Sequence, residues 1–125
     1  MILLSKEQVI KLHQKLLDKT GGLDGIRDDG LLESALVSAF HAFDGTELYP
    51  STVAKIARVA FSLISNHPFV DGNKRIGTYV MLILLELNNI SCAFTDDDII
   101  HIGLEIAKGT MNDLELLNLI LERLN

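Results

Sequence analysis

The segment "HPFVDGNKRIGTYVMLILLEL", residues 67–87, joins two very different kinds of sequence. Its first nine residues hold a histidine, a proline, an acid, a glycine, an asparagine and two cations. The remainder is apolar almost all round, which is typical of a helix buried at the centre of a bundle. Pro68 disfavours helical backbone at His67, so a preceding helix should end there. The segment therefore predicts a polar loop that leads into the central helix of the fold.

Apolar residues keep helical spacing on both sides of this segment, so the fold class is predicted to be all-α. Capping and turn residues predict six helices. We expect them to begin after Ser5, near Leu31, at Pro50 or Ser51, near Lys74, after Thr95 and at Asn112. The second helix should extend to Phe40. The connection "FDGTELYPST" should be rich in turns, and no region alternates well enough to predict a strand. The last helix is expected to bury Leu114, Leu117, Leu121 and Leu124.

The composition predicts one folded domain over residues 1–125, with a single core. An apolar fraction of 48% and a charged fraction of 22% are ordinary for a folded, soluble chain. The net charge of −6 argues against direct binding to nucleic acid, which requires a basic surface. A single cysteine, Cys92, excludes an internal disulfide framework and suits a reducing cytosol. The first residues lack a signal-peptide core, and the longest apolar run contains Glu86 and is too short for a bilayer. We expect a cytoplasmic protein without a membrane partner.

The polar loop has the features of a phosphate-binding site. Asp71, Gly72 and Asn73 are typical turn residues, and the following helix should begin at Asn73 or Lys74. Its free N–H groups would point back into the loop, where a preceding glycine leaves room for phosphate oxygens. Lys74 and Arg75 stand at the helix end that disfavours cations. Their positions are best explained if an anion binds there.

Asp71 and two further residues complete a possible reaction centre. Asp71 can hold a magnesium ion that is shared with phosphates, because magnesium is often bound through one carboxylate. A neutral His67 can take a proton from an incoming hydroxyl. Phe69 is expected to anchor the loop in the core. Base, metal ligand, anion cradle and cations together predict phosphoryl or nucleotidyl transfer.

Each of these residues alone has an ordinary structural explanation. A histidine before a proline is usually a cap or a surface residue, Asp-Gly-Asn is usually a plain turn, and Lys-Arg is usually solvated. Their combination at the head of the most apolar helix favours a site. Other known motifs fit poorly: a P-loop needs a second glycine and a Ser or Thr after the lysine. An EF-hand would need an oxygen ligand at Arg75, and no His/Cys spacing for zinc occurs.

The stretch "HPFVDGNKRIGT" resembles the Fic-domain motif H-x-F-x-[DE]-G-N-G-R-x-x-R. Residues 21–36, "GGLDGIRDDGLLESAL", are similar to the N-terminal region of one branch of that family, the death-on-curing (Doc) toxins. The resemblance implies the Fic fold, with ATP as substrate and Mg²⁺ as cofactor. It implies that His67 is the general base and Asp71 the magnesium ligand. The backbone around Gly72 and Asn73 would form the anion hole, with Arg75 on a phosphate.

Two departures from the motif bear on the reaction. Lys74 replaces a glycine and Thr78 replaces a second arginine, and both residues of the motif help seat the nucleotide for AMP transfer. The Doc branch shares these departures and moves the γ-phosphate of ATP onto a threonine of elongation factor Tu, which inhibits translation. A lysine at position 74 would also fill space near the backbone and add charge that neutralises a transferred phosphoryl group. We therefore predict a Doc-like protein kinase. A Fic-type AMP or nucleotidyl transferase and a non-catalytic binding module are the alternatives.

The resemblance also concerns partners. Residues 41–51, "HAFDGTELYPS", stand in the place of the family's flap, where Leu48 or Tyr49 would either contact a target or serve only in packing. Many Fic proteins carry an inhibitory motif [ST]-x-x-x-E-[GN], and this chain has no match to it. A Doc-like toxin is restrained instead by an antitoxin with a disordered segment that folds on binding. We expect such a partner.

Overall fold

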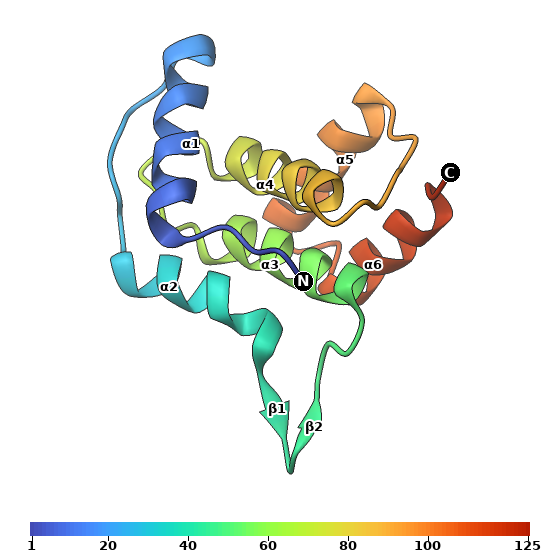
Figure 1. Cartoon of the computed structure of the whole chain (residues 1–125). Coiled ribbons are helices and arrows are strands. Elements are labelled where there is room, and N and C mark those ends of the chain that lie inside the picture. Colours follow the sequence, from blue (N-terminus) through green and yellow to red (C-terminus); the bar gives the residue numbers. More distant parts are fainter.

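The computed structural model describes all 125 residues and contains six α-helices (Figure 1). These are α1 (Lys6–Thr20), α2 (Asp29–Val37), α3 (Thr52–Asn66), α4 (Asn73–Leu87), α5 (Asp96–Lys108) and α6 (Asp113–Glu122). A 3₁₀ turn, η1 (Ser38–Phe40), follows α2, and two short antiparallel strands, β1 (Ala42–Phe43) and β2 (Thr46–Glu47), precede α3. The predicted six-helix, all-α fold is confirmed. None of the helices combines the length and hydropathy needed to cross a membrane.

The region between α2 and α3 differs from the prediction in two ways. The second helix was expected to run to Phe40, but its α-helical part ends at Val37 and the rest is the 3₁₀ turn. The connection was expected to hold no strand, whereas it forms a hairpin that projects from the bundle (Figure 1). Asp44 and Gly45 turn the chain at its tip, with φ of 52° and 78°, as tight hairpins require. Strands of two residues are too short to produce a visible alternation, so periodicity could not reveal them. The Asp44-Gly45 pair was the available signal for the hairpin.

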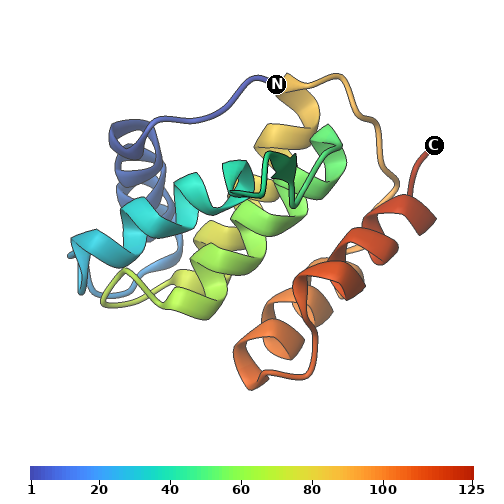
Figure 2. The ribbon, with the colours of Figure 1, turned by 90° about the horizontal axis from the view of Figure 1, so that it is seen from below.

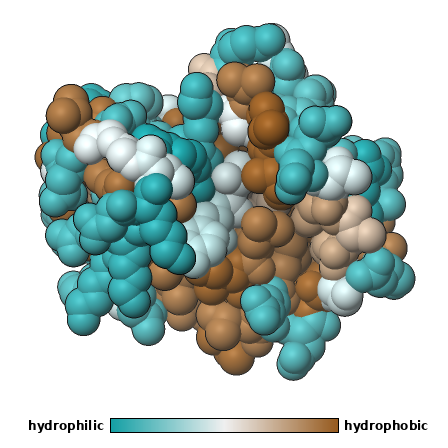
Figure 3. Space-filling view, turned by 90° about the horizontal axis from the view of Figure 1, so that it is seen from above, coloured by the Kyte–Doolittle hydropathy of each residue, from teal (hydrophilic) through white to brown (hydrophobic).

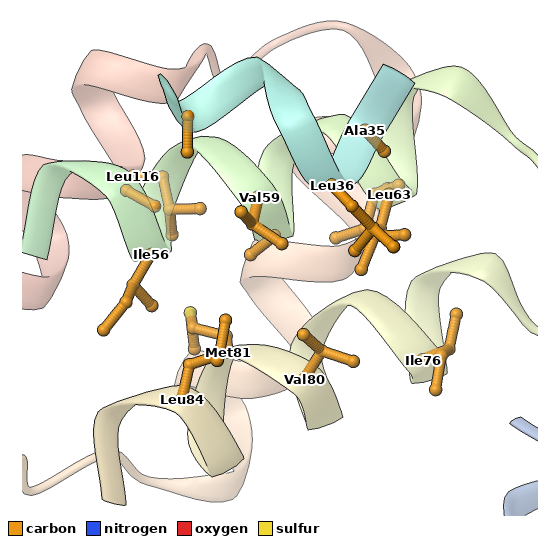
Figure 4. Close-up of a cluster of buried hydrophobic side chains, with 14 of the residues drawn as sticks. Ala35, Leu36, Ile56, Val59, Leu63, Ile76, Val80, Met81, Leu84 and Leu116 are labelled. Carbon is orange, nitrogen blue, oxygen red and sulfur yellow. The ribbon is translucent and has the colours of Figure 1, made fainter. Parts of the chain in front are cut away.

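Helices α3 and α4 occupy the centre of the bundle. Helix α3 packs against α2, α4, α5 and α6, and Figure 2 shows α3 between α2 and α6. Figure 4 shows side chains of α2, α3, α4 and α6 meeting in one core. A Cβ at Gly77 would lie 2.4 Å from Cγ1 of Ile64, so this glycine allows α4 to approach α3 closely. The close approach fixes the two helices whose ends carry the polar loop.

The buried face of α6 is not the predicted one. Leu116 and Ile120 are fully buried, whereas Leu114 is 60% exposed. The predicted set was Leu114, Leu117, Leu121 and Leu124, of which Leu121 and Leu124 are also exposed. Both stripes of this leucine-rich helix have helical spacing, so periodicity alone could not select between them. Contact with α3 decides which stripe is buried.

Candidate active site

The polar loop, residues 67–72, lies between α3 and α4, as predicted. Helix α3 ends at Asn66, and His67 takes a left-handed conformation with φ 52° and ψ 54°. Phe69 is buried in the core, which confirms its predicted place. Gly72, with φ 78°, precedes the first residue of α4, Asn73. The loop thus reverses the chain within a few residues and exposes His67 beside the start of α4.

Six of the residues singled out in the sequence line one cavity of about 560 Å³. They are His67, Asp71, Gly72, Asn73, Lys74 and Arg75, with Ile64 of α3 and Ala107 of α5 completing the wall. Phe69 lies in the core instead. The fold therefore brings the proposed base, metal ligand and cations into a shared space.

The N-terminus of α4 is open toward this cavity. The other five helices each have an N-cap side chain that accepts a backbone N–H; the caps are Ser5, Asp28, Ser51, Thr95 and Asn112. Gly72 gives α4 no such cap. The N–H groups of Asn73, Lys74 and Arg75 have no acceptor within the chain. Free N–H groups at a helix start, next to positive charge, are suited to phosphate oxygens.

The side chain of Asn73 stabilises the loop, whereas its backbone N–H is free. It is buried, and its amide oxygen accepts the N–H of Phe69 at 3.0 Å. Its amide nitrogen donates to the carbonyl oxygen of Phe69, also at 3.0 Å. This double hydrogen bond holds the loop closed, so only the Asn73 N–H is available to a ligand.

Asp71 has the properties of a single-carboxylate metal ligand. Its oxygens accept the N–H of Leu23 at 3.1 Å and the N–H of Gly72 at 2.8 Å. These bonds, the one from Leu23 foremost, lower the pKa of Asp71 below its ordinary value. The side chain is 44% exposed, so the ionised carboxylate can reach a further partner. No cluster of three or more metal-ligating side chains is present, so a magnesium ion here would take most of its oxygens from phosphates and water.

The two cations of the loop differ in their contacts. Arg75 donates to the Thr20 hydroxyl and, at 2.8 Å, to the carbonyl oxygen of Gly21, both at the end of α1. Its Nη2 lies 3.7 Å from the Asp71 carboxylate. Lys74 is exposed and makes no ion pair or side-chain hydrogen bond. Lys74 is thus the free cation of the cavity, while Arg75 ties α1 to the loop; its predicted phosphate contact stays a prediction.

The segment between α1 and α2 holds the loop in place, which the sequence did not reveal. The Arg27 guanidinium donates to the carbonyl oxygens of His67 at 2.6 Å and Asn66 at 2.9 Å. The Arg27 backbone N–H donates to the Pro68 carbonyl oxygen at 2.7 Å. These bonds satisfy the carbonyl end of α3 and fix the backbone of His67.

His13 and Gly22, which precede Arg27 in the chain, also lie against Asp71. His13 of α1 is buried, stacks on Phe69 and lies 2.7 Å from the Asp71 carbonyl oxygen. Gly22 has a φ of 123°, and a Cβ there would lie 2.7 Å from the Asp71 carboxylate. A histidine among the apolar residues of one helical face, four positions before Leu17, was the available signal. Its partner is 58 positions away, beyond the reach of local patterns.

The sequence model of one protein family, described as the Fic/DOC family, matches residues 3–85. The chain belongs to the Fic/DOC family. The match covers α1 to α3, the whole loop and most of α4. "Toxin Doc" from Mycolicibacterium smegmatis is 36% identical over 73 residues, which are 58% of this chain and 56% of the toxin. The chain therefore spans little more than half of that relative. The resemblance to the Doc branch of the family is confirmed.

The hairpin of this Fic/DOC protein is fastened through Tyr49. Its hydroxyl donates to the Asp113 carboxylate at 2.9 Å, and Arg58 donates to the same carboxylate at 3.0 Å. Burial, then the bond to Asp113, raise the pKa of Tyr49. These contacts assign Tyr49 to packing, whereas the side chain of Leu48 is exposed. Of the two residues considered for target contact, Leu48 is the accessible one.

The Fic/DOC site thus presents four kinds of chemistry to one cavity: an exposed imidazole, an ionised carboxylate, free backbone N–H groups and an unpaired ammonium. The imidazole can take up a proton, and the other groups can neutralise or orient negative charge. Groups of these kinds serve reactions in which a hydroxyl attacks a bound phosphate.

Proposed function

We propose that this Fic/DOC protein is a Doc-like toxin that transfers the γ-phosphate of ATP to a serine or threonine hydroxyl of a protein. The observation that carries the proposal is the uncapped start of α4, which faces the same cavity as His67 and Asp71. Modification of the target would inhibit translation, and elongation factor Tu is the target we propose to test first.

In the proposed reaction, His67 takes the proton of the target hydroxyl. The hydroxyl oxygen forms a bond to the γ-phosphorus, the bond from that phosphorus to the β–γ bridging oxygen breaks, and ADP leaves. The N–H groups of Asn73, Lys74 and Arg75 would bind the phosphate oxygens. Asp71 would hold Mg²⁺, which when bound neutralises charge on the phosphates. The left-handed backbone at His67 presents the imidazole to the cavity from the side of α3.

An apolar cleft of about 220 Å³ next to the cavity supports a nucleotide as the donor. Lys74 and Arg75 line both spaces, and Ile99, Ile100 and Leu104 of α5 give the cleft its apolar wall. We place the adenine base there, because ligand clefts are mostly apolar with a few polar groups at one end.

The state of Thr78 supports γ-phosphate rather than AMP transfer. Its hydroxyl donates to carbonyl oxygens of its own helix, those of Lys74 at 3.0 Å and Arg75 at 3.2 Å. It therefore offers no charge and no free donor at the position where the motif has a second arginine. A phosphate beside Thr78 would therefore find no partner in this side chain.

Restraint by an antitoxin is the second part of the proposal. Figure 3 shows a hydrophobic area on the face between α1 and α5. Of the large hydrophobic side chains of α4, those of Tyr79, Leu82 and Leu87 are exposed. We propose that the folding segment of an antitoxin covers this area, because it adjoins the cleft and an occupant would obstruct nucleotide entry. Leu82→Asp should then prevent neutralisation by the co-expressed antitoxin and leave phosphate transfer intact; unimpaired neutralisation would contradict the placement.

The reaction is tested with ATP labelled on either the α- or the γ-phosphate. The purified chain is incubated with Mg²⁺ and either bacterial lysate or purified elongation factor Tu, with His67→Ala as the control. A His67-dependent protein band labelled only from the γ-position is the expected result. Label from the α-position would establish AMP transfer instead. Absence of both labels would favour the non-catalytic binding module.

A second variant examines Lys74 in the same assay. Lys74→Gly restores the glycine of the Fic motif and removes the free ammonium from the cavity. We expect weaker γ-labelling and the appearance of some α-labelling. An unchanged γ-labelling rate would show that the lysine does not select the reaction.

A further inference from the structure

His13 is a buried histidine that the proposed transfer does not use. Its side chain is 1% exposed, and its ring stacks on Phe69 with 3.8 Å between centroids and 12° between planes. Its Nε2 lies 2.7 Å from the carbonyl oxygen of Asp71. His13 thus contacts two residues of the loop, one through its ring face and one through a ring nitrogen.

The contact with Asp71 shows which ring nitrogen donates. A peptide carbonyl oxygen can only accept, so Nε2 carries the proton that is shared. The nearest acid on the other side is Asp24, whose carboxylate lies 4.0 Å from Nδ1 and is beyond hydrogen-bond distance. The bond to the Asp71 carbonyl is therefore the one hydrogen bond that the His13 side chain makes within the chain.

The bond from His13 also constrains the direction of the Gly72 N–H, because the Asp71 C=O and the Gly72 N–H belong to the same peptide group. In a trans peptide the C=O and the following N–H point in opposite directions. With the Asp71 C=O directed at His13, the Gly72 N–H is directed away from α1, and it donates to the Asp71 carboxylate at 2.8 Å. The same carboxylate also accepts the Leu23 N–H. The orientation of the Asp71–Gly72 peptide therefore sets one of the two backbone hydrogen bonds that hold this carboxylate.

We propose that His13 is a positioning residue of the active site, which orients the Asp71–Gly72 peptide so that the Asp71 carboxylate and the start of α4 face the cavity. The proposal rests on the proposed function for its catalytic consequence, but its structural consequence at Gly72 is independent of any activity. A histidine fits the position because it combines a flat ring for Phe69 with an N–H donor at the far edge of that ring.

Two pairs of variants separate the hydrogen bond from packing. His13→Phe keeps a ring against Phe69 and removes the donor. His13→Gln and His13→Asn both remove the ring, but only glutamine is long enough to place an N–H where Nε2 stands. The pair Gln and Asn decides the matter even if His13→Phe fails to fold. His101→Phe, an exposed histidine on α5, is the matched control.

Two readouts are measured for each folded variant: the hydrogen-exchange rate of the Gly72 amide by NMR, and the Mg²⁺ concentration that gives half-maximal γ-phosphate transfer. Removing the donor should speed Gly72 exchange and raise the Mg²⁺ requirement by about tenfold or more. We expect this for His13→Phe and His13→Asn, with His13→Gln close to the wild type and His101→Phe unchanged.

Equal values for His13→Asn and His13→Gln, or wild-type values for His13→Phe, would overturn the positioning role. A wild-type protein that transfers no label would instead contradict the proposed function. In that case the Gly72 exchange rate alone still decides whether His13 orients the peptide, so the two failures are distinguishable.

Discussion

The starts of α4 and α5 are built in opposite ways. Helix α5 begins with a complete capping box, in which Thr95 and Asp98 satisfy each other's backbone N–H, and its first turn holds three acids. Helix α4 begins with a left-handed glycine, has no cap, and carries Lys74 and Arg75 in its first turn. Acids stabilise the positive end of a helix and cations destabilise it. The N–H groups of Thr95 and Asp98 at the start of α5 are therefore satisfied within the chain, whereas those at the start of α4 have no acceptor within the chain.

The difference indicates that the start of α5 serves stability, whereas the start of α4 is suited to binding a ligand. A protein keeps an unfavourable local arrangement mainly where function requires it. Packing against α3, through the close contact at Gly77, holds α4 in place without help from a cap. The cost of the uncapped end is thereby offset by the core, and the free N–H groups stay available to a ligand. The following four predictions test this comparison.

The largest effect is expected from His67→Ala at the α4 site. Loss of a general base should lower the transfer rate by about 10²- to 10⁴-fold, with nucleotide binding retained because the start of α4 is unchanged. His101→Ala on α5 is the control and should transfer at the wild-type rate. Single-turnover labelling from γ-labelled ATP measures both, and a His67→Ala variant with near wild-type transfer would remove the assignment of the base.

Asp71→Asn should raise the Mg²⁺ requirement by at least about tenfold. The pKa of Asp71 is lowered by the Leu23 and Gly72 N–H groups. Its charged form is thus favoured in the folded state, so its contribution to stability is present above the unfolded pKa of about 3.9 and is lost as the pH falls through the folded value. Asp71 therefore stays ionised from pH 5 to pH 8, so the ratio between the Mg²⁺ requirements of Asp71→Asn and the wild type should be constant over that range. A ratio that falls to one within that range would contradict the assignment.

The charges at the starts of α4 and α5 can be exchanged one at a time. Reversing the charge at the start of α4 should raise stability and lower ATP affinity. Lys74→Glu gives α4 an acid like those of α5, so we expect stability to rise by about 0.3–1 kcal/mol and ATP affinity to fall about tenfold. The converse variant Asp97→Lys should destabilise the protein by a similar amount and leave ATP affinity unchanged. Urea unfolding and calorimetric titration give the two quantities. A Lys74→Glu variant that binds ATP normally would separate this lysine from the site.

The smallest effect is expected from Thr95→Ala, which removes the cap of α5. The free energy of unfolding should fall by about 1 kcal/mol and Tm by roughly 4 °C, with ATP binding unchanged. Thermal unfolding with and without ATP and Mg²⁺ measures this. Loss of ATP-dependent stabilisation in this variant would mean that the two helix starts are not independent.

Sequence patterns were most informative where a feature depends on neighbouring residues. The end of α3 at His67 and the start of α4 after Gly72 follow from a proline, a glycine and turn residues within a few positions. Residues 67–75 are near each other in the chain and could reach one cavity whatever the rest of the fold, and six of them do so. The capping boxes of α1, α5 and α6 are local in the same sense.

Features that depend on distant segments were not predictable. His13 and Arg27 contact the loop from 58 and 40 positions away. Nothing near either residue indicates its partner. The buried stripe of α6 was mistaken for the same reason, since contact with α3 determines it. The engagement of Arg75 with Gly21 depends on where α1 ends relative to α4, which no periodicity describes.

The most direct test of the central claim is an NMR titration of the backbone amides with ATP and Mg²⁺. The signals of Asn73, Lys74 and Arg75 should shift as their N–H groups bind phosphate oxygens, while those of the capped residues 96–98 in α5 should stay in place. Signals of residues 73–75 that do not move on saturation with ATP, or a larger shift at the start of α5, would contradict an anion site at the uncapped start of α4.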